Sequence, residues 1–386
     1  MMGDKMKVVI SIDSFKGSIN SIEAALAIKE GILNVFPSAT VLTFPLADGG
    51  EGTIDALCSN SNGKIINTVV TGPLGEKINS HYGIMAKNNT AVIEMAQAAG
   101  LPLVPLDKRN PMYTTTYGVG ELIKDAILKG CRNFIIGIGG SATNDVGIGM
   151  LQALGFGFYD KNGCQVSFGA QGLKELHTID FSGVMHELSE CTFNVACDVN
   201  NPLYGKNGCS LIYGPQKGAN IEEVCLMDEW IRNYVEFLNS NNIDTGANYP
   251  GCGAAGGLGF AFKSFLNANL QRGTEIIISQ TGVQDSICDA DIVITGEGRL
   301  DGQTVMGKAP IGIAEIAKKY NKLVIAFSGC VTDDALICNE HGIDAFFPIL
   351  RNFSSLDEAL DKHNATKNLI NTSNQVFKLI KSIKNV

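Results

Sequence analysis

The sequence contains few basic residues and few histidines, and each shortage argues against a class of function. Its 386 residues include 30 Lys and Arg against 39 Asp and Glu, which gives a formal net charge of −9. Proteins that bind the nucleic-acid backbone usually present a basic surface, so we expect no nucleic-acid partner. The 5 histidines are scattered outside the glycine-rich segments described below, which disfavours Ser-His-Asp hydrolysis and a His-dependent dehydrogenase.

The sequence also lacks cysteine pairs and long hydrophobic runs. Its 11 cysteines include no C-x-x-C pair, and their odd number argues against a disulfide framework. We therefore expect most of them to be small buried residues in a reducing compartment. The sequence has no run of 18 apolar residues and no apolar segment of signal-peptide type at its start. These absences predict a soluble cytoplasmic protein with no membrane partner.

Apolar segments of strand and helix length alternate at both ends of the chain. Strand-like runs at 7–13 and 39–47 flank a helical apolar stripe at 21–36. The same alternation begins with a strand at 290–296 and continues to residue 349. This pattern predicts a parallel sheet with helical crossovers. The tail at 375–384 has helical apolar spacing, which favours a packing helix over a partner surface.

The middle of the sequence has a different pattern. Short alternating runs after residue 65 are broken by "GPLG" and "KNNT", which predicts antiparallel hairpins. A helix, a strand and a second helix follow up to about residue 154, and turn-rich sequence continues to residue 257. We infer an α/β fold in which a mixed α/β domain at 65–286 is inserted into a parallel-sheet domain formed by 1–64 and 287–386.

One glycine-rich segment, "GIGGSATND" at 137–145, resembles a dinucleotide-binding turn. It matches G-x-G-x-x-A, and Asp160 follows at the spacing of a ribose contact. A second match occurs in "GCGAAGGLG" at 251–259, and the chain has 44 glycines, so chance matches are easy. Glycine-lined walls that let backbone amides approach phosphates, or let loops pack tightly, account better for both segments. An NAD-dependent oxidoreductase remains the alternative.

Charged side chains follow several of the predicted strands. Asp13 and Lys16 follow the first strand, Asp48 follows the second, and "TGEGRLDGQT" follows the strand at 290–296. Since ligands of parallel sheets bind beyond the carboxyl ends of the strands, these residues should share one edge. Carboxylates with Lys and Arg suit phosphoryl transfer with Mg²⁺. The nearby "GQTVMGK" is no P-loop, because Ala309 stands where Ser or Thr is required. Lys308 at the start of the next helix either meets an anion or is simply solvated.

Long segments of the chain together resemble the type I glycerate kinases of bacteria. They include "IDSFKGS", "PLADGGEGT", "IGIGGSATNDVGIGMLQALG", "ACDVNNPLYG", "GPQKGA" and "TGEGRLDGQTVMGKAP", and the resemblance runs from about residue 7 to residue 350. It implies ATP-dependent phosphorylation of D-glycerate, dependence on Mg²⁺, and a flavodoxin-like domain joined to a second α/β domain. The chain has Ile12 where this family more often has Pro, and Asn200 where the family often has Asp. These two differences concern how the substrate fits rather than which reaction is catalysed.

Roles for the charged residues follow from the needs of the substrate. Glycerate has a carboxylate and two hydroxyls, so Arg299 and Lys16 are candidates to bind its carboxylate and the transferring phosphoryl group, with Asp13 beside them. Either Asp198 or Asp48 would orient the attacking hydroxyl. The resemblance favours transfer to the 2-hydroxyl, giving 2-phosphoglycerate, and the 3-hydroxyl remains the alternative.

The remaining predicted roles concern Mg²⁺ and ATP. Glu297 and Asp301 are the candidate Mg²⁺ ligands, directly or through water. The segment at 137–145 becomes an amide-rich phosphate cradle, after which Asn144 and Asp145 would start a helix. The predicted ATP-binding residues are Gly139, Gly140, Ser141, Thr143, Asn144 and Lys308.

Two further questions remain open at the level of sequence. A sugar-acid-binding regulator that has kept the fold without the chemistry is a second alternative; it would bind glycerate but turn over no ATP. Association into a homodimer is also left open.

Overall fold

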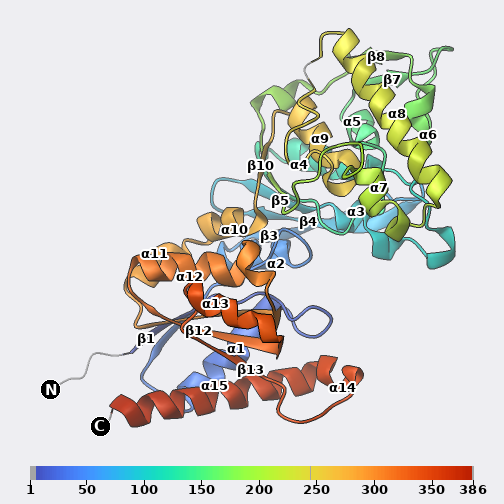
Figure 1. Cartoon of the computed structure of the whole chain (residues 1–386). Coiled ribbons are helices and arrows are strands. Elements are labelled where there is room, and N and C mark those ends of the chain that lie inside the picture. Colours follow the sequence, from blue (N-terminus) through green and yellow to red (C-terminus); the bar gives the residue numbers. More distant parts are fainter. Residues whose placement is uncertain (1–5, 244, 385–386) are drawn as a thin grey trace. The chain divides into compact units, whose positions relative to one another are not determined.

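Segments from both ends of the chain form one parallel sheet. The computed structural model describes residues 6–243 and 245–384, and in it five strands follow the order β13-β12-β11-β1-β2 (Figure 1). Numbered along the sequence, this is the 2-1-3-4-5 order of flavodoxin, so the predicted flavodoxin-like domain is confirmed. The strands are β1 (Lys7–Ile10), β2 (Thr40–Thr43), β11 (Ile292–Leu300), β12 (Leu323–Val331) and β13 (Ala345–Pro348).

Helices cover both faces of this sheet. On one face lie α1 (Ser21–Leu33) and α15 (Lys362–Lys384), which pack against each other, and α11 (Val283–Cys288) and α12 (Ala309–Lys319) lie on the other (Figure 1). Phe377 of α15 is fully buried in the same core as Ile10 and Phe327, so the tail is a packing helix, as its spacing predicts. This part of the chain also contains α10 (Gly273–Thr281), α13 (Ile337–Glu340) and α14 (Leu356–Leu360).

The second sheet is mixed and comes from the middle of the chain. Its order is β10-β9-β6-β5-β4-β3. The antiparallel pairs β3-β4 and β4-β5 turn at "GPLG" and "KNNT", which confirms the predicted hairpins, while the pairs from β5 to β10 are parallel. The strands are β3 (Lys64–Thr71), β4 (Lys77–Met85), β5 (Thr90–Glu94), β6 (Asn133–Gly137), β9 (Thr192–Ala196) and β10 (Asn269–Gln271).

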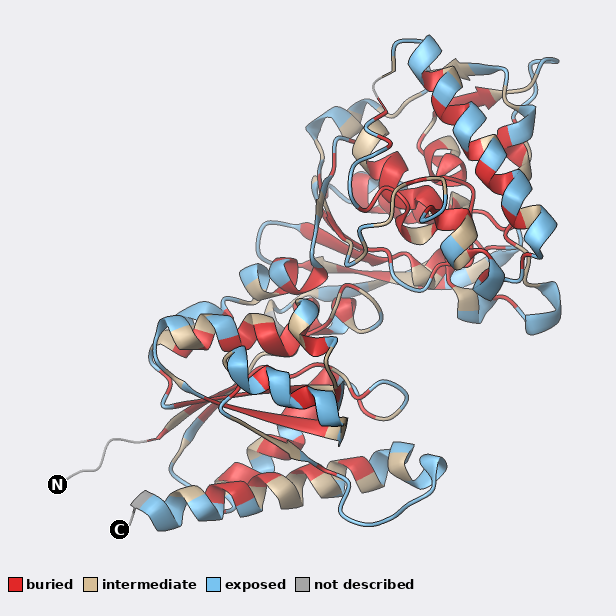
Figure 2. Cartoon of the chain, viewed as in Figure 1, coloured by how far each residue is buried: buried red, intermediate tan, exposed pale blue. Residues whose placement is uncertain are grey.

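A 20-residue helix, α8 (Ile221–Ser240), occupies sequence that we expected to be turn-rich. That prediction was wrong because the sequence carries a clear helix start: the Asn220 side chain accepts from the Glu223 amide, and Glu223 accepts from the Asn220 amide. Figure 2 shows α8 buried along one side and exposed along the other. The remaining elements are α2 (Thr53–Asn60), α3 (Ala96–Ala99), α4 (Tyr117–Leu128), α5 (Ile148–Ala153), β7 (Gly157–Tyr159), α6 (Gln171–Glu175), β8 (Thr178–Asp180), α7 (Cys209–Tyr213) and α9 (Ala254–Phe265).

The chain divides into two compact units, which we call the terminal unit (Met1–Asp48 with Thr274–Val386) and the inserted unit (Gly49–Gly273). The sequence suggests boundaries near 65 and 287 instead. The difference in boundaries has a packing reason. Helix α2 contacts strands β4 and β5 of the mixed sheet, whereas α11 contacts α12, a helix that covers the parallel sheet. Residues 1–5, 244 and 385–386 lie outside the described residues. No helix of the described chain is both long and apolar enough to cross a membrane.

Candidate active site

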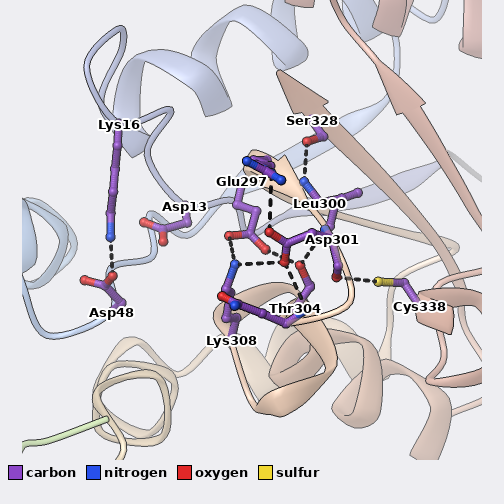
Figure 3. A network of polar contacts seen from close by, with 12 residues as sticks. Asp13, Lys16, Asp48, Glu297, Leu300, Asp301, Thr304, Lys308, Ser328 and Cys338 are labelled. Carbon is purple, nitrogen blue, oxygen red and sulfur yellow. Dashed lines mark hydrogen bonds and ion pairs between the residues drawn. The ribbon is translucent and has the colours of Figure 1, made fainter. Parts of the chain in front are cut away.

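Charged side chains follow β1 and β2 at one edge of the terminal unit's sheet. The exposed ammonium of Lys16 forms an ion pair with the Asp48 carboxylate (Figure 3). Asp13 lies between this pair and Glu297 in the same view, and its amide donates to the Gly296 carbonyl of β11 at 3.0 Å. The strand order reverses between β1 and β11, which is where ligands bind in flavodoxin-like sheets. The predicted convergence of these residues is therefore present within the terminal unit.

Asp13 has an unusual electrostatic environment. Burial raises the pKa of its carboxyl group to about 7, and the negative charges of Asp48 and Glu297 act in the same direction. A hydrogen bond from the Ser14 amide and the charge of Lys16 oppose these effects only in part. Asp13 can therefore exchange a proton near neutral pH, a property that sequence reasoning did not foresee.

A second group of charges lies at the end of β11. Lys308 Nζ is 3.4 Å from Glu297 Oε2 and 3.5 Å from Asp301 Oδ1, so one ammonium joins both carboxylates (Figure 3). Thr304 donates its hydroxyl to Glu297 Oε1 at 2.8 Å. Burial raises the pKa of Glu297, and the Lys308 charge opposes this shift. Arg299 is largely exposed, with Nε 3.4 Å from Asp301 Oδ2.

The length of β11 explains how Glu297 and Arg299 are positioned. We expected this strand to end at Gly296, but it continues to Leu300, with Arg299 opposite Cys330 of β12. Glu297 and Arg299 are two positions apart on a strand and therefore share a face. Gly296 has φ 151°, and a Cβ there would lie 1.9 Å from the Phe327 carbonyl oxygen, so this pairing requires glycine.

The "GQTVMGK" segment does not form a P-loop in the structure. A 3₁₀ turn at Thr304–Met306 separates β11 from α12, and Lys308 is the residue immediately before that helix. Its ammonium contacts the two carboxylates described above. The rejection of a P-loop from the sequence agrees with this geometry.

The predicted phosphate cradle lies in the inserted unit between β6 and α5. Gly139 and Gly140 are exposed, whereas Ser141, Thr143 and Asn144 are buried. The cradle is thus a loop with an exposed glycine tip and a buried polar base. Gly140 adopts φ 75°, a conformation that favours glycine.

The helix after this loop begins later than the sequence suggests. Asn144 and Asp145 do not start α5, which begins at Ile148. Asp145 is fully buried, and its carboxylate accepts hydrogen bonds from the amides of Thr116, Gly147 and Gly149 and from the Thr116 hydroxyl. The prediction for this segment was wrong because the carboxylate organises a turn whose partner, Thr116, is distant in sequence.

Asp198 also belongs to the inserted unit. It follows β9, as expected, and its side chain is exposed. Asp198 Oδ1 accepts from the Gly273 amide at 3.1 Å, which orients the carboxylate. The structure therefore divides the predicted residues, with Asp48 in the terminal unit and Asp198 in the inserted unit.

Neither glycine fingerprint belongs to a dinucleotide-binding unit. The strand after α5, β7, pairs antiparallel with β8 and lies outside the sheet that contains β6. Asp160 accepts the amides of Asn162 and Cys164 within its own turn. In the second segment, a Cβ on Gly256 would lie 2.0 Å from the Thr143 carbonyl oxygen, so that glycine permits tight loop packing. This geometry gives the NAD alternative no support.

Sequence reasoning assigned no role to one polar residue that contacts the loop after β6. Lys217 is buried, and its ammonium donates to Ser141 Oγ and to the Thr143 carbonyl. It stands 76 residues beyond Ser141, and a lone lysine in "GPQKGA" gives no local sign of burial. Only tertiary structure brings Lys217 to the loop.

Comparison with known proteins gives one consistent result over nearly the whole chain. A family model described as the glycerate kinase family matches residues 8–381. The glycerate 2-kinase of Escherichia coli (strain K12) is 48% identical over 355 residues, which cover 92% of this chain and 93% of that protein. The glycerate kinase of Bacillus subtilis (strain 168) is 45% identical over 379 residues, which cover 98% of this chain and 99% of that protein.

A solved structure agrees with these relatives. The crystal structure described as glycerate kinase 2 from Salmonella typhimurium LT2 superimposes with a TM-score of 0.91 and 44% sequence identity. The match covers 99% of this chain and 100% of that one. The chain therefore belongs to the glycerate kinase family.

Proposed function

We propose that this chain is an enzyme that transfers the γ-phosphoryl group of ATP to the 2-hydroxyl of D-glycerate, giving 2-phosphoglycerate and ADP. Relatives named glycerate kinase, one of them a glycerate 2-kinase, support this reaction. The observation that carries the proposal is the group of Asp13, Lys16, Asp48 and Glu297 at the β1/β11 edge of a flavodoxin-like sheet.

In the terminal unit, we propose that the two exposed cations bind the anionic groups of the reaction. Arg299 binds the carboxylate of glycerate through its planar pair of donors, and Lys16 contacts the transferring phosphoryl group. Asp13 binds a substrate hydroxyl, since a carboxyl group with a pKa of about 7 can accept or donate a hydrogen bond. Asp48 or Asp198 accepts the proton of the attacking hydroxyl.

We propose Glu297 and Asp301 as the residues that hold Mg²⁺. Among the described residues, no group of three or more His, Cys, Asp and Glu side chains is placed to hold a metal ion. Magnesium that binds together with a nucleotide needs only one or two carboxylates, and these two share contact with Lys308 Nζ, so the donor set fits. When bound, Mg²⁺ neutralises charge on the phosphates.

For ATP, we propose that the loop with Gly139, Gly140, Ser141, Thr143 and Asn144 binds phosphates. The exposed glycines allow backbone amides to approach an anion closely, which supports this role. Lys308 is proposed as a further phosphate contact because its ammonium lies against the two carboxylates proposed to hold Mg²⁺. A cytoplasmic location and a homodimer stay predictions.

The experiment that tests the reaction is ATP consumption with D-glycerate and Mg²⁺, followed by phosphorus NMR of the product. We expect turnover and a 2-phosphoglycerate signal. A 3-phosphoglycerate signal would correct only the position of transfer, whereas turnover with another hydroxy acid alone would keep the kinase and discard the substrate. Glycerate binding without ATP turnover would instead support the sugar-acid-binding alternative.

A further inference from the structure

A buried lysine of the inserted unit contacts the loop after β6 and has no role in the proposal above. Lys217 ends the 3₁₀ turn Pro215–Lys217 and is only 2% exposed. Its Nζ donates to Ser141 Oγ at 2.8 Å and to the Thr143 carbonyl at 2.7 Å. One ammonium therefore fixes two positions of the proposed phosphate cradle.

The charge of Lys217 has no direct counter-ion in the described part of the chain. No carboxylate of the described residues lies within 4.0 Å of Nζ. Burial lowers the pKa of Lys217 to about 8, and electrostatic interaction with Cys209 and Asp145 opposes this shift. Asp145 is occupied by the backbone and hydroxyl donors described above. Because a buried ammonium without an ion pair is costly, the site is suited to receive an anion.

The direction of the hydrogen bonds at Ser141 also favours a bound anion. An ammonium can only donate, so Ser141 Oγ accepts from Lys217 and its own hydroxyl proton remains available. Ser141 directly follows the exposed residues Gly139 and Gly140. Two more atoms of this loop, Thr143 Oγ1 and Asn144 Oδ1, are buried without a hydrogen-bond partner. Buried polar atoms of this kind normally have a partner, which here favours a bound polar group.

We propose that Lys217 is a positioning residue that fixes Ser141 and supplies the positive charge for a phosphoryl group bound at Gly139–Ser141. This inference rests on the proposed role of the loop in phosphate binding. Backbone amides at a glycine tip, a hydroxyl donor and a buried cation together suit a multiply charged phosphoryl group better than a single carboxylate. The phosphoryl group belongs either to the nucleotide or to the phosphorylated acid.

The first test measures binding to the full chain by titration calorimetry, with ADP, 2-phosphoglycerate and D-glycerate as separate probes. Lys217→Met keeps most of the side-chain volume but removes the charge, and we expect it to weaken a phosphorylated probe at least about tenfold while D-glycerate binding changes less than about twofold. If Lys217→Met weakens only ADP binding, the phosphoryl group at the loop belongs to the nucleotide. If it weakens only 2-phosphoglycerate binding, the phosphoryl group belongs to the phosphorylated acid. Both results support the proposal, whereas loss confined to D-glycerate would overturn it.

Lys263→Met is the matched control. Lys263 also belongs to the inserted unit and donates to a backbone carbonyl, that of Ala268, but it does not contact the loop after β6. We expect it to bind all three probes as the wild type does. Lys217→Arg, which keeps the charge, should retain more affinity for the phosphorylated probe than Lys217→Met. If both variants lose this affinity equally, Lys217 has only a packing role and the proposal is overturned.

A second measurement does not depend on whether Lys217→Met folds. In the wild type, affinity for the phosphorylated probe should fall between about pH 7.5 and about pH 9.5, as Lys217 loses its proton. The titratable groups that act on Nζ are Cys209 of α7, whose own pKa is raised to about 11, and Asp145, whose pKa is raised by burial. Cys209→Ser should leave the decrease unchanged, and a flat profile would overturn the proposal.

Two loop variants separate failure of this inference from failure of the proposed loop function. Ser141→Ala removes the hydroxyl, and Gly139→Ala adds a methyl group at an exposed position whose nearest neighbouring atom lies at 3.4 Å. If both variants bind phosphorylated probes normally, the loop is not the phosphate site and the proposed loop function fails together with this inference. If both weaken binding while folded Lys217→Met does not, only the role of Lys217 is overturned.

Discussion

The cations to which we assign roles in anion binding are held in different ways in the two units. In the terminal unit, Lys16 and Arg299 are exposed and form ion pairs with Asp48 and Asp301. In the inserted unit, Lys217 is buried and bonded to a hydroxyl and a backbone carbonyl. Exposed ion pairs contribute little to stability, so a ligand can replace one partner at small cost. Buried groups instead fix a geometry, which suits a loop that must keep its shape.

The largest expected effect comes from removing a carboxylate that acts on the attacking hydroxyl. Whichever of Asp48→Asn and Asp198→Asn removes the proton acceptor should lower kcat by roughly 10²–10⁴-fold while the fold stays intact. Steady-state kinetics and thermal melting would measure both properties. Glu30→Gln, an exposed carboxylate of α1, is the control and should leave kcat unchanged. Near-wild-type turnover in one of the two variants would show that its unit does not supply the base.

The next largest effect concerns the stability cost of Asp13. The pKa of Asp13 is raised to about 7 in the folded state, so its protonated form contributes favourably to the free energy of unfolding. This contribution is fully present below about pH 4 and is lost as the pH rises through 7. Asp13→Asn should therefore raise the free energy of unfolding at pH 8 by up to roughly 4 kcal/mol, with little change at pH 4, and lower activity. Urea denaturation at both pH values measures this. Equal stability at pH 8 would contradict the raised pKa.

A smaller effect is expected for Arg299. Arg299→Met should raise KM for D-glycerate roughly 10–100-fold and change kcat much less, because it removes a charged hydrogen bond made in the ground state as well as in the transition state. Initial rates at varied D-glycerate and saturating ATP measure this split. A KM increase for ATP alone would move Arg299 from the substrate to the nucleotide.

The smallest effect compares the two units through matched helix caps. Asn20 caps α1 in the terminal unit and Asn220 caps α8 in the inserted unit, each with a glutamate three residues later. Replacing either with Ala should lower the free energy of unfolding by about 1 kcal/mol and leave kinetics unchanged. If only one of two calorimetric transitions shifts in each variant, the units unfold separately. A single transition shifted by both would show that they unfold together.

Much of the terminal unit could be predicted because its signals are local. The apolar runs of β1, β11 and β12 mark a parallel sheet, and the position of Asp13 just after β1 places it at the ligand edge without further information. The extension of β11 to Leu300 was not predictable, since "GEGRL" contains glycines and charges that normally end a strand.

The inserted unit was harder to predict because its key contacts are long-range. Lys217 reaches Ser141 across 76 residues, and Asp145 bonds to Thr116 across 29. No spacing rule connects such pairs. The α8 helix, by contrast, was missed although the sequence carries local signals for it, namely a capping box and apolar Val224, Ile231 and Leu238 at helical spacing. In the terminal unit, the raised pKa of Asp13 was likewise not predictable, because it depends on burial, which composition does not reveal.

The most direct test of the account is a crossed binding experiment on the two units. D-glycerate and ADP are titrated separately into the wild type, Arg299→Met and Gly139→Ala. We predict that Arg299→Met weakens D-glycerate binding and spares ADP, while Gly139→Ala weakens ADP binding and spares D-glycerate. If both variants weaken the same ligand, or if neither weakens any, the proposed roles of Arg299 in glycerate binding and of the loop after β6 in ATP binding are contradicted.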